Sequence, residues 1–246
     1  MKLRSLIVAC ALSLTLFLFA ARRQNSNGSG TPEFRGTVDL THPISRQSTK
    51  ISGSNFAREE FTQQFATTLQ APAIAVKGSW TVDQIPSERL IAPLVVIDVA
   101  SKARRNADYQ LSMEDVAEWE REHGNVPAGA IVIADTGWAA HWNSQAEYRN
   151  PDVSGDMHFP GISFEAARFL VEARSIFGLG IDTMSVDYGA SRNHPVRRYT
   201  AAHGIYHLEN VSNLDLTPKS GAIVIASPEK LQNSPEAPVR IVALLR

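Results

Sequence analysis

Short runs of β-branched and other apolar residues recur along the chain and alternate with amphipathic segments. Four of these runs have the length of a strand, and most are apolar throughout, as is typical of strands covered on both faces; they span residues 94–99, 130–134, 221–226 and 239–244. Strands of this kind that alternate with helices predict a mixed α/β domain.

Two helices are predicted from the residues that begin them. The segment 112–122 opens with a serine followed by acidic residues in its first turn, which favour a helix start. The segment 163–173 opens with a serine and a glutamate in the same way. Prolines such as Pro195 are expected in the connecting loops.

Residues 1–21 have the order of an export signal. Two basic residues lie within positions 1–4, and an apolar run without charge follows at positions 5–21. We expect a cleaved signal peptide and a periplasmic or extracellular protein; an uncleaved membrane anchor formed by the apolar run is the alternative. Residues 22–35 are polar and rich in Gly, Ser and Asn, which predicts a flexible linker before a folded domain at residues 36–246.

Charge and cysteine content narrow the classes of partner and cofactor. Lys and Arg number 24 and Asp and Glu 25, so the chain has no excess of positive charge for a nucleic-acid partner. Membrane contact is expected only through the N-terminal segment. The only cysteine, Cys10, lies in that segment, so a metal site in the domain would need nitrogen and oxygen ligands.

Five stretches of the predicted domain resemble the landmarks of one family, in the same order. They are GTVDLTHPIS at 36–45, WTVDQIP at 80–86, MHFPG at 157–161, GIDTMSVDYG at 180–189 and LENVSNL at 208–214. The family is the cyclase family, which includes kynurenine formamidase and isatin hydrolase. The resemblance implies a single α/β domain, with a mixed β-sheet and packed helices, assembled as a homodimer.

The metal motif of that family is almost entirely substituted in this chain. In the family it has the form His-x-Gly-Thr-His-x-Asp-x-Pro-x-His, and it holds Zn²⁺ or Mn²⁺ to activate a water molecule for hydrolysis. The positions that match its histidines and aspartate carry Gln64, Thr68, Gln70 and Ile74. Neutral amides, a hydroxyl and an alkyl group are poor ligands for these ions, so we expect no metal cofactor there.

Two downstream positions indicate a rearranged pocket. The resemblance implies that Glu209 is the glutamate that completes the family's metal shell, whereas a family histidine is replaced by Arg197. A carboxylate left in a cleft without its metal needs another positive partner, and a guanidinium provides charge and directed hydrogen bonds. We therefore predict an ion pair between Arg197 and Glu209, and both are candidate catalytic residues.

His207 is the third candidate catalytic residue. It precedes Glu209 by two positions in a predicted strand, so the two side chains are expected on one face. Together with His203 they would form a relocated Zn²⁺ or Mn²⁺ site, or His207 and Glu209 an acid–base pair. The alternative is that these histidines make ordinary hydrogen bonds.

Trp80, His158 and Phe159 are candidates for a substrate cleft. The family counterpart of the segment that contains His158 lines that cleft, and aromatic side chains offer large apolar contact to a planar ligand. A capping role in a turn is the alternative for His158, and core packing is the alternative for the aromatic residues. Asp182 and Asp187 also match family positions and are interpreted as turn carboxylates that accept backbone hydrogen bonds.

Three functions follow from these observations. The first is an exported, catalytically impaired family member that binds a small aromatic or carbonyl compound in the old cleft. The second is an active hydrolase, similar to kynurenine formamidase, that uses a relocated metal site or acts without metal. The third is a structural partner subunit of a relative whose metal motif is complete. The sequence favours the first, because the substitutions fall on the coordinating side chains themselves.

Overall fold

The computed structural model describes residues 34–43 and 66–246. Phe34–Arg246 form one compact unit. The predicted export segment, most of the predicted linker and Gln64 of the metal motif lie outside the described residues. Within these two ranges, no helix is long and apolar enough to cross a membrane.

The described strands form an eight-stranded mixed sheet and a separate pair. The sheet contains β1 Gly36–Asp39, β2 Thr68–Gln70, β3 Ile91–Asp98, β5 Ile131–Asp135, β7 Gly178–Ile181, β8 Tyr206–Glu209, β9 Ile223–Pro228 and β10 Glu236–Leu245, and the pair contains β4 Gln110–Leu111 and β6 Gly161–Ile162. The sheet order is β1-β10-β2-β8-β7-β5-β3-β9, in which β3, β5, β7 and β8 run parallel. Because β9 also pairs with β10, seven strands close into a barrel-like sheet, and β1 lies against β10.

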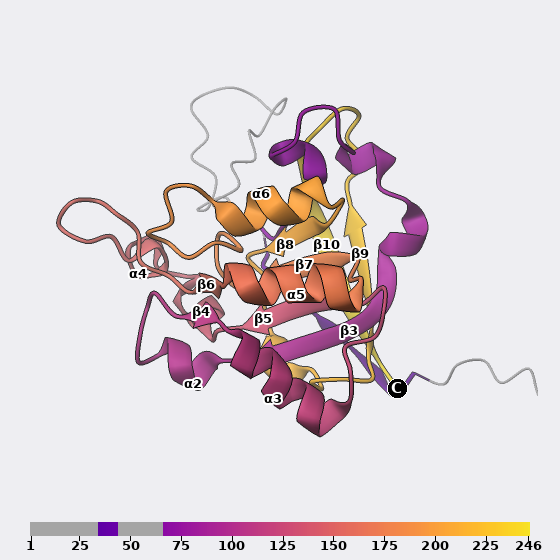
Figure 1. The fold of residues 1–246 in the computed structure, drawn as a ribbon, viewed down its shortest axis with the longest axis horizontal. Coiled ribbons are helices and arrows are strands. Elements are labelled where there is room, and N and C mark those ends of the chain that lie inside the picture. Colours follow the sequence, from indigo (N-terminus) through magenta and orange to yellow (C-terminus); the bar gives the residue numbers. More distant parts are fainter. Residues whose placement is uncertain (1–33, 44–65) are drawn as a thin grey trace, which may run out of the picture. The chain divides into compact units, whose positions relative to one another are not determined.

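Three helices cover one side of the parallel strands. They are α3 Met113–His123, α5 Phe164–Arg174 and α6 Pro195–Ala202, and α5 lies between the other two (Figure 1). Two shorter helices are α2 Ala100–Ala103 and α4 Gln145–Arg149. Single 3₁₀ turns occur at η2 Pro72–Ile74, η3 Val82–Gln84, η4 Ser87–Arg89, η5 Trp138–His141 and η6 Leu214–Leu216.

The predicted elements are found close to their expected positions. The four apolar runs fall in β3, β5, β9 and β10, and the two predicted helices correspond to α3 and α5. Ser112 and Ser163 cap these helices by accepting hydrogen bonds from backbone N–H groups of the first turn. The prediction that Pro195 lies in a loop is wrong, because it is the first residue of α6, where its missing N–H costs no hydrogen bond.

Alternating residues of the strands build two separate cores. One set points into the barrel, for example Leu94, Ile133 and Leu208. The intervening residues, such as Val95 and Val132, pack against α3 and α5 in the second core. Period-two alternation between two covered faces explains why these strands are apolar throughout.

Two glycines allow two loops beside the sheet to pack backbone against backbone. A Cβ on Gly161 would overlap the backbone nitrogen of Tyr188, and one on Gly189 would lie 2.7 Å from the backbone nitrogen of Phe159. The N–H of Gly189 also donates to the carbonyl oxygen of Phe159 at 2.9 Å. This close approach fixes the loop at residues 185–189, which contributes to the site described below.

The packing around Gly161 predicts the effect of adding one methyl group. Gly161→Ala should lower the free energy of unfolding by about 3 kcal/mol, because backbone atoms of Tyr188 would have to move. Gly36→Ala in β1 is the matched control, since its Cβ would lie 3.8 Å from the side chain of Leu245. Urea denaturation compares the two variants, and equal stability would contradict the close packing.

Candidate functional site

Four polar side chains from two neighbouring strands gather on the side of the sheet that faces the helices. The antiparallel register of β2 and β8 places Thr68 directly opposite Glu209, and Gln70 directly opposite His207. Directly opposed residues of antiparallel strands point to the same face. All four are buried, with at most 4% of their surface exposed. The prediction that His207 and Glu209 share a face is therefore confirmed.

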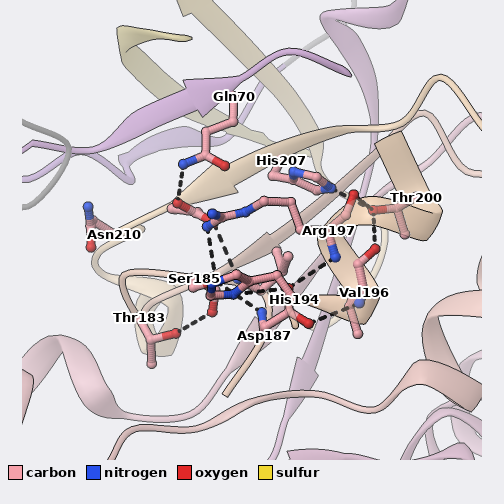
Figure 2. Close-up of polar contacts among 12 residues, drawn as sticks. Gln70, Thr183, Ser185, Asp187, His194, Val196, Arg197, Thr200, His207 and Asn210 are labelled. Atoms are coloured by element: carbon pink, nitrogen blue, oxygen red, sulfur yellow. Dashed lines mark hydrogen bonds and ion pairs between the residues drawn. The ribbon is translucent and has the colours of Figure 1, made fainter. Parts of the chain in front are cut away.

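The carboxylate of Glu209 is held by donors from three different elements (Figure 2). Nε2 of Gln70 donates to Oε2 at 2.7 Å, and Nη2 of Arg197 donates to Oε1 at 3.0 Å. The backbone N–H of Val186 also approaches Oε1, at 3.3 Å. The predicted ion pair between Arg197 and Glu209 is confirmed by this geometry.

The start of α6 positions Arg197. Asp187 accepts hydrogen bonds from the backbone N–H groups of Val196 and Arg197, at 2.9 and 3.1 Å, and so caps the first turn of the helix. Nη2 of Arg197 also donates to Oγ of Ser185 at 3.0 Å. The interpretation of Asp187 as a carboxylate that accepts backbone hydrogen bonds is confirmed, and the same bonds orient the guanidinium toward Glu209.

The environment of Glu209 favours its neutral form more than water does. Burial raises the pKa of this carboxyl from its ordinary 4.5 to about 7, although Arg197 and the N–H of Val186 oppose the rise. A nearby guanidinium therefore offsets only part of the cost of removing the charge from water.

His207 is held as a neutral ring whose protonated nitrogen can be assigned from its neighbours. The hydroxyl of Thr200 donates to the carbonyl oxygen of Val196 at 2.7 Å, so its oxygen accepts from Nε2 of His207 at 2.6 Å. Nδ1 of His207 is then a bare acceptor that is buried and has no partner among the described residues, and the same is true of Oε1 of the opposing Gln70. Burial, with a smaller contribution from Arg197, lowers the pKa of His207 to about 3.

The side chains at the family's metal positions do not fit a divalent transition ion. Thr68 offers a hydroxyl and Gln70 a neutral amide, while Ile74 has no donor atom. The single carboxylate, Glu209, already faces the fixed positive charge of Arg197. Zn²⁺ and Mn²⁺ sites need several imidazole or anionic ligands. The guanidinium of Arg197 lies 3.0 Å from Oε1 of Glu209, and its positive charge would repel a dication bound to that carboxylate.

The relocated metal site proposed from the sequence is not formed. His203 follows α6 and is exposed, with Nδ1 2.8 Å from the carbonyl oxygen of Tyr199, whereas His207 and Glu209 are fully buried. Over residues 34–43 and 66–246, no group of three or more His, Cys, Asp or Glu side chains is arranged to hold a metal ion. The prediction fails because the end of α6 turns His203 outward.

The three cleft candidates lie in separate environments. The guanidinium carbon of Arg89 lies over the ring of Trp80, 4.9 Å from the ring centroid. The ring of His158 contacts Asp108, with Nδ1 2.8 Å from Oδ2. Phe159 is 3% exposed and belongs to a small buried aromatic cluster with Trp138 and Tyr148. Phe159 therefore packs in the core, which was the alternative interpretation of this residue.

Sequence reasoning did not assign Ser185 and Thr200 to this site. Ser185 accepts from Arg197, and Thr200 fixes the tautomer of His207. Thr200 lies three residues after Arg197 on α6, and a helical interpretation of residues 195–202 would have placed both on one side. The proline at the start of this segment was the signal for that helix.

The raised pKa of Glu209 predicts a pH-dependent stability. A carboxyl whose folded pKa exceeds its unfolded value stabilises the fold at low pH, and this contribution is lost as pH rises from about 4.5 through about 7. The loss should be on the order of 3 kcal/mol. Glu209→Gln should remove this part of the slope, measured by urea denaturation between pH 5 and pH 8.

Burial also raises the pKa values of Asp135 and Asp182. Both residues are present in the wild type and in Glu209→Gln, so their contributions to the pH dependence cancel from the comparison. Parallel stability curves for the wild type and Glu209→Gln would contradict the assigned environment of Glu209.

Comparisons with known proteins agree with the fold and the landmarks. A family model described as "Putative cyclase" matches residues 38–188. Isatin hydrolase from Roseibium aggregatum is 32% identical over 169 residues, which cover 66% of this chain and 63% of that protein. Kynurenine formamidase from Polaromonas naphthalenivorans is 40% identical over 73 residues, which cover 30% of this chain and 32% of that protein. The chain thus spans less than two thirds of the length of each of these relatives.

A solved structure shows the same architecture. Isatin hydrolase A from Labrenzia aggregata, bound to benzyl benzoate, superimposes with a TM-score of 0.74 at 30% identity, covering 85% of this chain and 93% of that chain. The order of landmarks, the barrel-like mixed sheet and the match over residues 38–188 lead to one conclusion. The chain belongs to the cyclase family, and isatin hydrolase and kynurenine formamidase are among its relatives.

Proposed function

We propose that this protein is a member of the cyclase family that does not carry out metal-dependent hydrolysis and instead binds a small aromatic or carbonyl compound. The observation that carries the proposal is the contact between Nη2 of Arg197 and Oε1 of Glu209, at 3.0 Å. The carboxylate kept from the family's metal shell is thereby neutralised by a side chain. A cation that is part of the chain cannot bind and ionise a water molecule as Zn²⁺ or Mn²⁺ does.

The hydrogen bonds around Glu209 support the same proposal. Both carboxylate oxygens accept hydrogen bonds from Gln70 or Arg197, and Glu209 is only 1% exposed, so neither oxygen is open to a substrate. His207 is neutral, and its one N–H is committed to Thr200. A general base needs a free and basic lone pair within reach of the proton it removes. The oxygens of Glu209 are engaged, and the free Nδ1 of His207 is fully buried in a ring whose pKa burial lowers to about 3.

The class of ligand is proposed from the relatives. The structure of isatin hydrolase A from Labrenzia aggregata contains benzyl benzoate, an aromatic carbonyl compound. The relatives named isatin hydrolase and kynurenine formamidase also imply aromatic compounds with carbonyl groups. We therefore place isatin, benzyl benzoate and N-formylkynurenine among the first compounds to test.

Metal content and turnover test the proposal directly. The purified full chain should contain no stoichiometric transition metal, and Mn²⁺ or Zn²⁺ should give no heat of binding above buffer in calorimetric titration. Hydrolysis of isatin and N-formylkynurenine in the presence of either ion should not exceed the uncatalysed rate. Isatin hydrolase from Roseibium aggregatum, assayed in parallel, is the positive control. Stoichiometric metal or metal-stimulated turnover would refute the proposal.

A variant with the family's residues restored is the matched comparison. It combines the substitutions Q64H, T68H, Q70D, I74H and R197H. We expect this variant to bind Mn²⁺ because imidazoles and a carboxylate then replace the substituted side chains at the family's metal positions. Binding of isatin or benzyl benzoate to the unmodified chain is measured in the same series by the shift of its melting temperature, which should rise with ligand concentration.

A double-mutant cycle tests the electrostatic coupling on which the proposal depends. At pH 8, where Glu209 is ionised, Arg197→Met leaves a buried carboxylate without its cation and should cost about 3–5 kcal/mol of stability. In the Glu209→Gln background the same change should cost less by at least about 1 kcal/mol. Arg198→Met, on the exposed side of α6, is the matched control and should have little effect. Additive effects of Arg197→Met and Glu209→Gln would show that the pair is not coupled.

A further inference from the structure

A cavity lies between helix α6 and the turn that follows η2. Its volume is about 480 Å³, within the range of small-molecule sites. Pro195, Arg198, Tyr199 and Ala202 line it from α6. They are spaced by three and four residues, so they form a stripe along one face of the helix. Glu209 is not among the residues that line this cavity, which makes it a separate site.

Backbone hydrogen bonds fix the opposite wall of the cavity, which is formed by Ala75 and Val76. The N–H of Val76 donates to the carbonyl oxygen of Pro72 at 3.1 Å, and the N–H of Ser79 donates to the carbonyl oxygen of Val76 at 3.1 Å. η2 also packs against α6. Because both walls are already in place, little ordering of the chain is needed when a ligand binds between them.

Arg198 gives the cavity a positive charge. Its side chain is exposed, and its guanidinium has no hydrogen-bond or ion-pair partner in the part of the chain that the structure describes. No Asp or Glu is among the described residues that line the cavity. Two carboxylates that contact α6 are engaged elsewhere: Asp187 is buried and accepts from N–H groups of the first turn, and Glu172 accepts from the hydroxyl of Tyr199 at 2.6 Å. The cavity therefore favours an anion.

Most of the remaining lining is apolar. The ring of Tyr199 is held between neighbours, with centroids 5.1 Å from that of Phe164 and 4.3 Å from that of His203. Because its hydroxyl already donates to a glutamate, Tyr199 offers a ligand apolar contact and no free donor. Val76 and Pro195 add aliphatic surface. Aromatic and aliphatic side chains of this kind suit a planar apolar body.

We propose that this cavity is a ligand site for a small carboxylate with a planar apolar body, such as an aromatic acid. The carboxylate would accept hydrogen bonds from the guanidinium of Arg198 and from the side-chain amide of Asn193, which also lines the cavity. The body of the ligand would lie against Tyr199 and Val76. One guanidinium balances the single charge of a carboxylate, and the described lining has no further Lys or Arg for a phosphate group. This site does not rest on the function proposed above, and it goes beyond that function.

Three compounds of similar size and different charge test the charge preference. They are benzoate, benzyl alcohol and benzylamine, titrated into the full ¹⁵N-labelled chain and followed by NMR. Benzoate should shift the backbone amides of Val76, Arg198 and Tyr199, with an affinity about three- to fivefold above that of benzyl alcohol at low salt. Benzylamine should bind most weakly, and added salt should reduce the differences among the three compounds.

Two variants connect the binding to the named side chains. Arg198→Met removes the charge and should lower the affinity for benzoate to that for benzyl alcohol. Ala202→Phe fills the cavity and should weaken benzoate and benzyl alcohol alike. Both positions are exposed, so the two changes leave the cores intact. Arg105→Met, at an exposed position that does not line the cavity, is the matched control and should bind benzoate as the wild type does.

The proposal is overturned if benzoate leaves these amides unshifted, if the three compounds bind equally, or if Arg198→Met binds benzoate as tightly as the wild type. It is also overturned if Arg105→Met weakens benzoate as much as Arg198→Met does, because the attraction would then come from general surface charge. None of these outcomes bears on the metal content of the protein or on hydrolysis, so the two proposals fail separately.

Discussion

A carboxylate that is 1% exposed must be compensated, and Glu209 sets this requirement for the surrounding structure. The compensation comes from β2 through Gln70, from α6 through Arg197 and from the loop that contains Val186. Three segments that are far apart in the sequence thus meet at one charge. The substitutions at the family's metal positions become understandable as a set, because each removes a metal ligand or supplies a hydrogen bond to the carboxylate that stays behind.

The difference between a bound ion and a guanidinium is chemical as well as electrostatic. A transition ion exchanges its ligands and polarises a water molecule or a carbonyl oxygen. A guanidinium offers only directed N–H donors and never loses its charge in proteins. Arg197 provides positive charge where the family has a metal ion, but it cannot act as a Lewis acid. The family's scaffold is therefore compatible with a role in binding.

Features that depend on local pattern or on charge balance could be predicted from the sequence. Strands such as β3 and β5 were recognisable because both of their faces are covered, so their residues are apolar throughout. The pair of Arg197 and Glu209 followed from the family resemblance, which implied one pocket for both residues, and from the need to neutralise a carboxylate left there without a metal. That Asp187 accepts backbone hydrogen bonds followed from its position in a turn, whereas the helix whose first turn it caps was not predicted.

Features that depend on long-range register could not be predicted in this way. β2 has three residues, too few to show a period, so nothing in the local sequence placed Gln70 opposite His207. His203 is separated from His207 and Glu209 on β8 because of where α6 ends. Phe159 is buried by an aromatic cluster that is assembled from distant loops. In each case the deciding contact joins segments whose proximity exists only in the folded chain.

The pairing of β10 has a consequence for how the chain reaches this structure. β10 hydrogen-bonds to a segment 200 residues earlier, through Thr41 and Ile241, and Gln70 reaches Glu209 across 139 residues. Contacts of such sequence separation form late and slowly, because a long loop must lose its entropy before they contribute. The parallel strands and their helices have shorter connections. The barrel, and with it the pocket around Glu209, should thus be the last part to assemble, when β2 and β10 dock onto a preformed α/β layer.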